Sequence, residues 1–178
     1  MADIEVDLER IMEELERRFY GKYRGKVVDN NDPLQRGSVK VLVPGIMGDQ
    51  PLWALPCVPY AGLNVGFFAL PPVDASVWVE FENGRRDHPI WVGCFWEESE
   101  LPAADASPDI AFLRTPGAVI RIEASGTLEI ETAGGAKITL TGTEITLEAP
   151  SIKNNANGGS TALSAGGFDA MNGALKVV

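Results

Sequence analysis

Residues 76–94 read SVWVEFENGRRDHPIWVGC, and this stretch decides the fold of the chain around it. Apolar and polar side chains alternate through 76–81, which is the pattern of a half-buried β-strand. Asn83-Gly84 follows, and this dipeptide accommodates the positive φ angles of a tight turn. A second apolar run at 89–95 can then return beside the first. The stretch therefore predicts an antiparallel β-hairpin.

The segments before this hairpin predict further strands. Val27-Val28 leads into a cluster of Asn, Asp and Pro that favours turns, and short apolar runs follow at 38–43, 52–58 and 66–70. Strands this short and this closely spaced suit a small closed barrel. The oligonucleotide/oligosaccharide-binding (OB) fold is the natural candidate. We expect this barrel to occupy residues 21–97.

The N-terminal segment, residues 1–20, predicts an amphipathic helix over 3–19. Its apolar side chains recur at spacings of three and four, and charged side chains fill the other faces. A helix this short, with so narrow an apolar stripe, is marginal by itself. It therefore packs on its own domain or docks on a partner. The candidate docking residues are Ile4, Leu8, Ile11 and Leu15, with Phe19 continuing the stripe.

The chain beyond the barrel changes character twice. Residues 98–117 are rich in Glu, Pro, Ala, Ser and Asp without any period, and predict a linker. Residues 118–155 alternate apolar and polar side chains in short strands, which gives one apolar face and one wet face. The apolar positions are Ile120, Ile122, Leu128, Ile130, Ile138, Leu140, Ile145, Leu147 and Ile152.

Strands of this kind cannot enclose a core within one chain, because repeat units bury their apolar faces only against neighbours. Three copies could close a prism with the apolar pairs inside, where each buried side chain contributes roughly 1.5–3 kcal/mol. The pattern thus predicts a homotrimeric shaft over 118–155. Residues 156–178, which are rich in Asn, Gly, Ser and Ala, are expected to form a tip segment held by other chains.

Composition excludes several classes of function. The chain has 178 residues and a net charge of −10, so a general attraction to nucleic acid or anionic lipid is not expected. Two cysteines and one histidine exclude a disulfide-rich scaffold and the standard zinc motifs. The sequence has neither a long apolar span nor a secretory signal, which predicts synthesis in the cytoplasm.

No catalytic, cofactor or metal site is predicted. Asp87 and His88 are adjacent in sequence and would point to opposite faces of a strand, without a recognisable nucleophile nearby. Cys57, Cys94 and His88 match no standard spacing of metal ligands. We therefore expect turn and core roles for these residues, and no enzymatic activity.

Two other classes of function compete with a structural one. Lys and Arg residues of the barrel segment are interspersed with Tyr20, Tyr23 and Trp53, which is the residue mixture of an OB domain that binds single-stranded nucleic acid. Against this alternative stand the net charge and the C-terminal repeat. A carbohydrate-binding β-prism is the third class, but the repeat has no row of aromatic side chains.

Three blocks of the barrel segment resemble a known family. They are residues 27–33 with 37–41 and 43–44, residues 67–71 with 77–84, and residues 87–93, which read DHPIWVG. In this order they resemble the OB domain of the central spike of contractile tails, found in phage baseplate assembly protein V and in the VgrG spikes of type VI secretion. The repeat that follows resembles the intertwined β-helix needle of the same family.

The resemblance implies a mainly β protein with an N-terminal helix, an OB barrel and a trimeric intertwined β-helix needle. It implies a structural spike within the baseplate of a virion or a phage-tail-like particle, where contraction drives the needle transiently through a target membrane. The implied partners are two further copies, a hub or tail-tube protein, and a PAAR-like tip protein or effector. The chain lacks the ring-forming domain of VgrG and a His-x-His metal site after His88. A separate hub protein is therefore expected.

Overall fold

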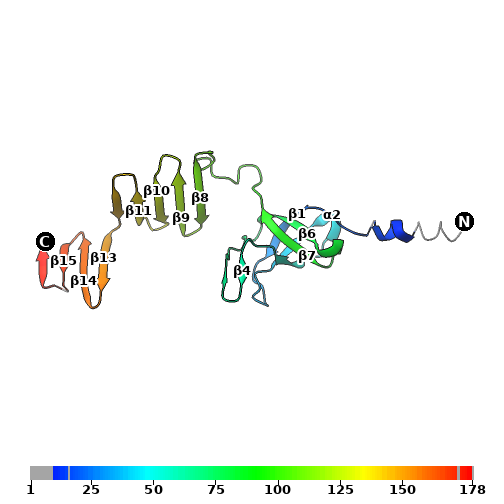
Figure 1. Ribbon diagram of the computed structural model, residues 1–178, viewed down its shortest axis with the longest axis horizontal. Helices are drawn as coiled ribbons and strands as arrows, with labels where there is room; N and C mark the ends of the chain where they lie inside the picture. Colours follow the sequence, from blue (N-terminus) through cyan, green and yellow to red (C-terminus); the bar gives the residue numbers. More distant parts are fainter. Residues whose placement is uncertain (1–9, 16, 172, 178) are drawn as a thin grey trace, which may run out of the picture. The chain divides into compact units, whose positions relative to one another are not determined.

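A computed structural model describes residues 10–15, 17–171 and 173–177. The described chain forms two compact units that divide between Glu100 and Leu101. The first unit contains a closed barrel, and the second contains two antiparallel sheets (Figure 1). The chain is mainly β, as predicted.

Five strands close the barrel in the order β1-β2-β3-β7-β6. They are β1 (Tyr23–Asp29), β2 (Val39–Leu42), β3 (Leu52–Pro56), β6 (Ser76–Phe81) and β7 (Pro89–Cys94). Neighbouring strands are antiparallel except β3 and β7, which pair in parallel. The predicted barrel is confirmed, and it is OB-like.

The barrel core is built from β-branched side chains that alternate inward along the strands. Val39 and Val41 of β2 and Val79 of β6 are fully buried. Valine suits these positions because its branched side chain packs well on a pleated surface. Trp91 of β7 is also buried, and its indole N–H donates to the Gly37 carbonyl at 3.2 Å. The barrel thus encloses its core without help from another chain.

The connection between β3 and β6 differs from the prediction. A short hairpin of β4 (Ala61–Gly62) and β5 (Val65–Gly66) occupies it, and residues 67–70 lie outside any strand. The prediction of a strand at 66–70 is wrong. Its residues, GFFAL, do not alternate, and Pro71-Pro72 beyond them offers no N–H to a strand ladder.

Two short helical turns complete the barrel. α2 (Pro44–Met47) begins at a proline, whose missing N–H is not needed in a first helical turn, and it buries Met47. The turn between β6 and β7 forms where predicted, with Asn83 at a φ of 53°. It is the 3-10 turn η1 (Glu82–Gly84), followed by a further turn over 85–88, and it is therefore longer than a two-residue loop.

Residues 10–15 of the predicted N-terminal helix are helical, whereas Ile4 and Leu8 lie outside the described residues. The chain has left the helix by Phe19, so the prediction that this residue continues the helical stripe is wrong. Its ring packs instead against those of Tyr23 and Phe81, with centroids 6.2 and 5.9 Å apart. Aromatic packing at the barrel thus ends the helix earlier than its periodicity indicates.

The second unit holds two sheets, each a simple antiparallel meander. The five-stranded sheet comprises β8 (Ile110–Thr115), β9 (Ala118–Glu123), β10 (Leu128–Thr132), β11 (Lys137–Leu140) and β12 (Ile145–Glu148). The four-stranded sheet comprises β13 (Ser151–Ala156), β14 (Gly159–Ser164), β15 (Gly167–Ala170) and β16 (Leu175–Val177).

Two predicted irregular segments contain strands. β8 lies within the predicted linker, 98–117, because the short apolar run at 110–113 pairs with β9. The predicted tip segment, 156–178, contains β14, β15 and β16, which pair in sequence order with β13. Low apolar content concealed the strands of the tip segment, since backbone hydrogen bonds do not depend on side-chain type.

The loop between β1 and β2 is organised by one carboxylate. Asp32 accepts hydrogen bonds from three backbone N–H groups, those of Leu34 at 2.9 Å, Arg36 at 2.7 Å and Ser38 at 3.1 Å. Burial acts to raise the pKa of this carboxyl group, but the backbone donors outweigh it and lower the pKa from 3.8 to about 2. The loop is therefore stabilised by the charged form of Asp32.

Because of this loop, the stability of the barrel should fall at acidic pH. The lowered pKa of Asp32 contributes stability that is present above the pKa of the unfolded chain, about 4, and that is lost as the pH falls toward the folded pKa of about 2. Replacing Asp32 by Ala should lower stability at pH 7 and remove this part of the acid dependence. All four tryptophans lie in the barrel unit. Urea unfolding followed by tryptophan fluorescence therefore measures the stability of the barrel at each pH. Asp49→Ala, a change at an exposed carboxylate, should leave the acid dependence intact.

Gly25 of β1 tests the packing of the barrel. An added Cβ would lie 3.1 Å from Val79 Cγ2 and 3.2 Å from the Leu42 carbonyl oxygen. Gly25→Ala should therefore lower the free energy of unfolding by about 1–3 kcal/mol, as overpacking of a core does. Gly45→Ala is the matched control, because nothing lies within 4 Å of its added Cβ. Equal effects of the two substitutions in urea unfolding would contradict this account.

Candidate assembly surface

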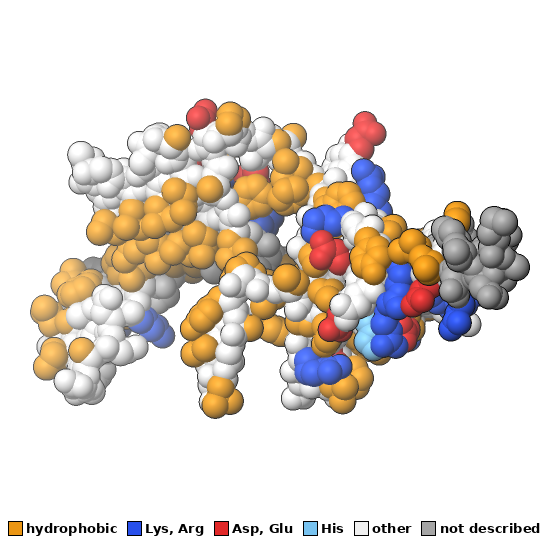
Figure 2. Space-filling model, turned by 45° about the vertical axis from the view of Figure 1, so that its right-hand side comes forward, with side chains coloured by type: hydrophobic (Ala, Val, Ile, Leu, Met, Phe, Trp, Pro, Cys, Tyr) orange, Lys and Arg blue, Asp and Glu red, His pale blue; other side chains and the backbone are white. Residues whose placement is uncertain are grey.

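The five-stranded sheet carries two rows of apolar side chains on one face. Strand register aligns them across all five strands, since each residue is the direct partner of the next. Figure 2 shows hydrophobic side chains gathered in a band over this sheet. One row is Leu113, Ile120, Ile130, Ile138 and Leu147, and the other is Ala111, Ile122, Leu128, Leu140 and Ile145.

The structure thus brings eight of the nine predicted core positions onto one face. The ninth, Ile152, lies in β13 of the four-stranded sheet, where it pairs with Leu163. Sequence reasoning missed Leu113 and Ala111, because β8 had been assigned to the linker. The run of four apolar residues at 110–113 was the signal that could have found them.

This apolar face is open in the single chain. Ile145 is 69% exposed, Ile122 is 54% exposed and Leu113 is 53% exposed. Cross-strand pairs of Ile and Leu stabilise a sheet when they are buried. Exposure of so many contiguous pairs marks an interaction surface. We therefore treat this face as the candidate assembly surface.

The opposite face of the same sheet is polar and carries its own ion pairs. Lys137 Nζ lies 2.6 Å from Glu129 Oε1, on the adjacent strand. The hydrogen bond to Glu129, with the charges of Glu131 and Glu148 nearby, raises the pKa of Lys137. A face that satisfies its charges in this way has no need of a partner to cover it.

A buried carboxylate fastens the segment before β8 to this sheet. The Asp105 side chain is fully buried and forms ion pairs with two arginines. Arg114 of β8 lies 2.6 Å away, and Arg121 of β9 contacts the other carboxylate oxygen. Charge-assisted pairs of this kind are strong hydrogen bonds. They join the segment before β8 to the first two strands of the sheet.

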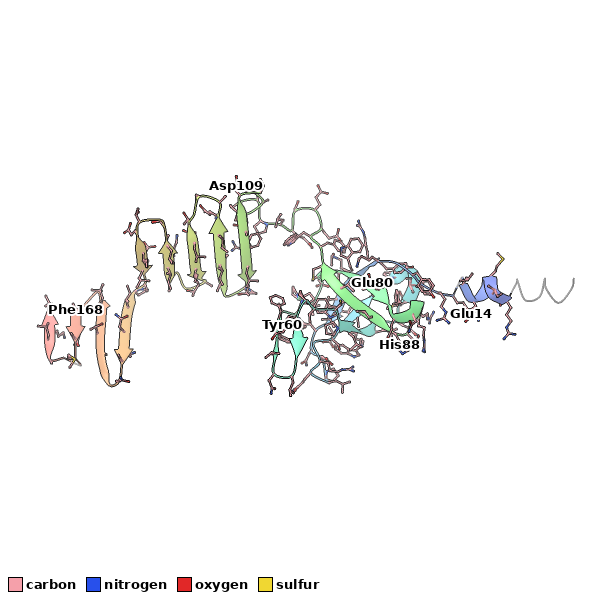
Figure 3. The ribbon with its side chains drawn as sticks, viewed as in Figure 1. Glu14, Tyr60, Glu80, His88, Asp109 and Phe168 are labelled. Atoms are coloured by element: carbon pink, nitrogen blue, oxygen red, sulfur yellow. The ribbon has the colours of Figure 1, made fainter. Side chains whose placement is uncertain are left out.

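The four-stranded sheet has a smaller apolar row. Ile152, Leu163, Phe168 and Val177 are successive partners across β13 to β16. Leu163 is 53% exposed and Phe168, labelled in Figure 3, is 40% exposed. This sheet therefore also presents apolar side chains that its own chain leaves open.

The N-terminal stripe, the apolar side chains of the N-terminal helix, is exposed among the described residues. Ile11 and Leu15 are 57% and 61% exposed, and neither belongs to the barrel core. They lie on the helical residues 10–15, one helical turn apart, and so share a face. The docking role of Ile11 and Leu15 stays a prediction.

The residues weighed for catalysis and metal binding are placed as follows. His88 Nδ1 lies 3.0 Å from Asp87 Oδ1 in the turn before β7. Hydrogen bonds from His88 and Arg85 lower the pKa of Asp87 to about 2, so this carboxylate is a weak base. Cys57 and Cys94 are exposed free thiols, so the expected core role of these residues is wrong. Partial burial of its sulfur raises the pKa of Cys94. Among the described residues, no three His, Cys, Asp or Glu side chains are grouped to hold a metal ion.

Two residues of the nucleic-acid alternative, Tyr23 and Lys22, are engaged with other groups of the barrel. Tyr23 packs against Phe19 and Phe81, which removes its ring from the surface available for stacking. Lys22 pairs with Glu80 at 2.6 Å, a contact on the outside of the barrel where Figure 3 labels Glu80. Tyr20 is 68% exposed, so these contacts remove part of the stacking surface that the nucleic-acid alternative would use, but not all of it.

A substitution at Asp105 tests how much its ion pairs stabilise the second unit. Asp105→Leu removes two charge-assisted hydrogen bonds and leaves two arginines that are partly exposed to water. We therefore expect the free energy of unfolding of the second unit to fall by about 1–3 kcal/mol. The second unit has no tryptophan, so far-ultraviolet circular dichroism in urea at fixed protein concentration reports it while fluorescence reports the barrel. Asp109→Leu, a change at an exposed side chain in the same segment, should shift stability by less than about 0.5 kcal/mol.

Comparison with known proteins bears on the barrel. Residues 23–96 match the family model of the type VI secretion system/phage-baseplate injector OB domain. The match begins with β1 and ends just after β7, so it covers the closed barrel. None of the curated proteins matches the chain. No helix among the described residues is long and apolar enough to cross a membrane.

The matched domain family is a structural one of baseplates, in agreement with a protein that is not an enzyme. The resemblance drawn from the three sequence blocks is confirmed for the barrel. The remaining residues, including the two sheets of the second unit, lie outside the match. The barrel of this chain is therefore similar to the injector OB domain of type VI secretion systems and phage baseplates.

Proposed function

We propose that the chain is the homotrimeric central spike of a contractile phage tail or phage-tail-like injection system. The single observation that carries this proposal is the open apolar face of the five-stranded sheet, with its two aligned rows of Ile and Leu. The match of the barrel to the injector OB domain supports the setting. The spike would therefore sit in the baseplate of a virion or related particle.

The apolar face explains why several copies are needed. Each large side chain of the two rows gains roughly 1.5–3 kcal/mol when it is fully buried. A single-layer sheet cannot provide that burial to itself, whereas three sheets that turn their apolar faces to a common axis can. The polar face, with the Lys137–Glu129 pair, would then face water around the shaft. This arrangement is the needle that the resemblance implies.

The mechanism is mechanical. Contraction of the sheath drives the tube and its spike forward, and a rigid narrow shaft concentrates the force on a small area of the target membrane. Strands paired along the shaft leave few free edges, so unwinding must break contacts in all three chains together. No bond in a substrate is made or broken by this action.

The two ends of the chain would connect the spike to its partners. The N-terminal stripe, with Ile11 and Leu15 exposed, would dock on a separate hub or tail-tube protein. The four-stranded sheet, with Leu163 and Phe168 exposed, would hold a PAAR-like tip protein or an effector. Both surfaces are apolar and open, which is the property that these contacts require.

The proposal is tested by placing a charge on either face of one strand. Ile138→Asp would put carboxylates of three chains near one axis, an unpaired burial that costs several kcal/mol per chain. Thr139→Asp places the same charge on the polar face and is the matched control. Native mass measurement should give a trimer for the wild type and for Thr139→Asp, and a single chain for Ile138→Asp.

Folding must be checked in the same samples. Ile138 is 39% exposed in the single chain, so a charge there does not by itself unfold the sheet, and tryptophan fluorescence should report an intact barrel in both variants. A wild-type protein with the mass of one chain at micromolar concentration would contradict the proposed spike. A stable trimer of Ile138→Asp would show that the apolar face is not the trimer core.

A further inference from the structure

The hairpin of β4 and β5 projects from the barrel with apolar side chains open to water. Leu63 at its tip is 92% exposed, and Phe68 beyond it is 76% exposed. Tyr60, labelled in Figure 3 at the base of the hairpin, is 59% exposed. Its strands have two residues each, and a lone two-stranded hairpin is at best marginally stable in water. Something must therefore cover it in the working protein.

A groove of about 400 Å³ lies between this hairpin and the barrel. Gly37, Pro56 and Trp91 line it on the barrel side, and Val65 and Phe67 line it on the hairpin side. The barrel side is rigid, because the Trp91 indole N–H donates to the Gly37 carbonyl at 3.2 Å. The groove is thus a preformed apolar site that can accept a large aliphatic side chain.

The charge distribution limits what can occupy this region. The chain carries a net charge of −10, yet residues 51–73 contain no charged side chain at all. Copies of the same acidic chain repel one another, so they approach most easily through a surface without charge. A partner recognised through opposite charges would find none to pair with in this segment, and Arg36 is the one charged residue among those that line the groove. The uncharged segment is therefore suited to contact with another copy.

The hairpin and the N-terminal segment lie on different sides of the barrel. Phe19 donates its backbone N–H to the Gly84 carbonyl at 2.8 Å, which places the N-terminal segment at the turn between β6 and β7. Figure 1 shows the hairpin leaving the barrel on the side away from this turn. The end of the barrel that would meet a hub through the N-terminal segment is therefore not the end that carries the hairpin.

We propose that the hairpin of each copy inserts Leu63 into the groove beside Gly37 of the next copy. Projection and groove lie on the same chain, and such a contact closes into a ring when the rotation between copies is one third of a turn. This interface would tie the three barrels together, separately from the apolar faces of the shaft. The proposal rests on the proposed trimeric spike and names the contact between its barrels.

A disulfide cross-link in the full chain tests this contact. Leu63→Cys and Arg36→Cys are combined in a Cys57→Ser, Cys94→Ser background, because Arg36 is an exposed residue that lines the groove. After mild oxidation with diamide, a denaturing gel should shift most of the protein from the one-chain band to the three-chain band. The control pairs Leu63→Cys with Arg86→Cys, which lies at the turn between β6 and β7, and should stay at one chain.

The outcomes separate this proposal from the proposed function. A trimeric native mass with only one-chain bands after oxidation would overturn the hairpin contact and leave the spike standing. A one-chain native mass would overturn the spike, and the hairpin contact with it. Flotation of the wild type, but not of Leu63→Asp, with phosphatidylcholine vesicles would overturn the hairpin contact in favour of a lipid surface. In that assay Leu34→Asp is the control, because Leu34 is 64% exposed and lies outside the uncharged segment.

Discussion

The rest of the structure depends on one constraint, which is that a single-layer sheet with an apolar face must be covered. In the five-stranded sheet the Ile and Leu rows align strand by strand, so the open surface is continuous. The polar face forms ion pairs such as Lys137–Glu129 and can stay in contact with water. Covering the apolar face would therefore stabilise the sheet further, because it would bury apolar side chains. In the proposed trimer, further copies cover this face.

The barrel obeys the opposite rule. Its inward side chains, such as Val39 and Val79, are fully buried within one chain, and its strands close on themselves so that no edge is left open. A unit of this kind folds without partners and can present short surface features on a rigid frame. The exposed hairpin of β4 and β5 and the N-terminal stripe are such features. Stability and assembly are therefore assigned to different parts of the chain.

Charge is distributed in agreement with this division. The chain is acidic overall, and some of its basic side chains form ion pairs within the chain, as where Arg114 and Arg121 bind the buried carboxylate of Asp105. The surfaces left for association, which are the two Ile and Leu rows and the segment 51–73, contain no charge. Like-charged copies can meet only where their repulsion is weakest, and contacts between apolar surfaces are less sensitive to salt than charged ones.

The sequence by itself determined the strand periodicity, the turn at Asn83-Gly84 and the apolar identity of positions such as Ile120 and Ile138, because alternation and turn chemistry are local properties. Only the tertiary structure decided which residues meet. It placed β8 beside β9, joined Asp105 to its arginines and moved Phe19 from the helical stripe to the aromatic cluster of Tyr23 and Phe81. It also left residues 67–70 outside any strand and formed an exposed hairpin at 61–66. These outcomes depend on contacts between residues distant in sequence, and a pattern within a short window carries no information about them.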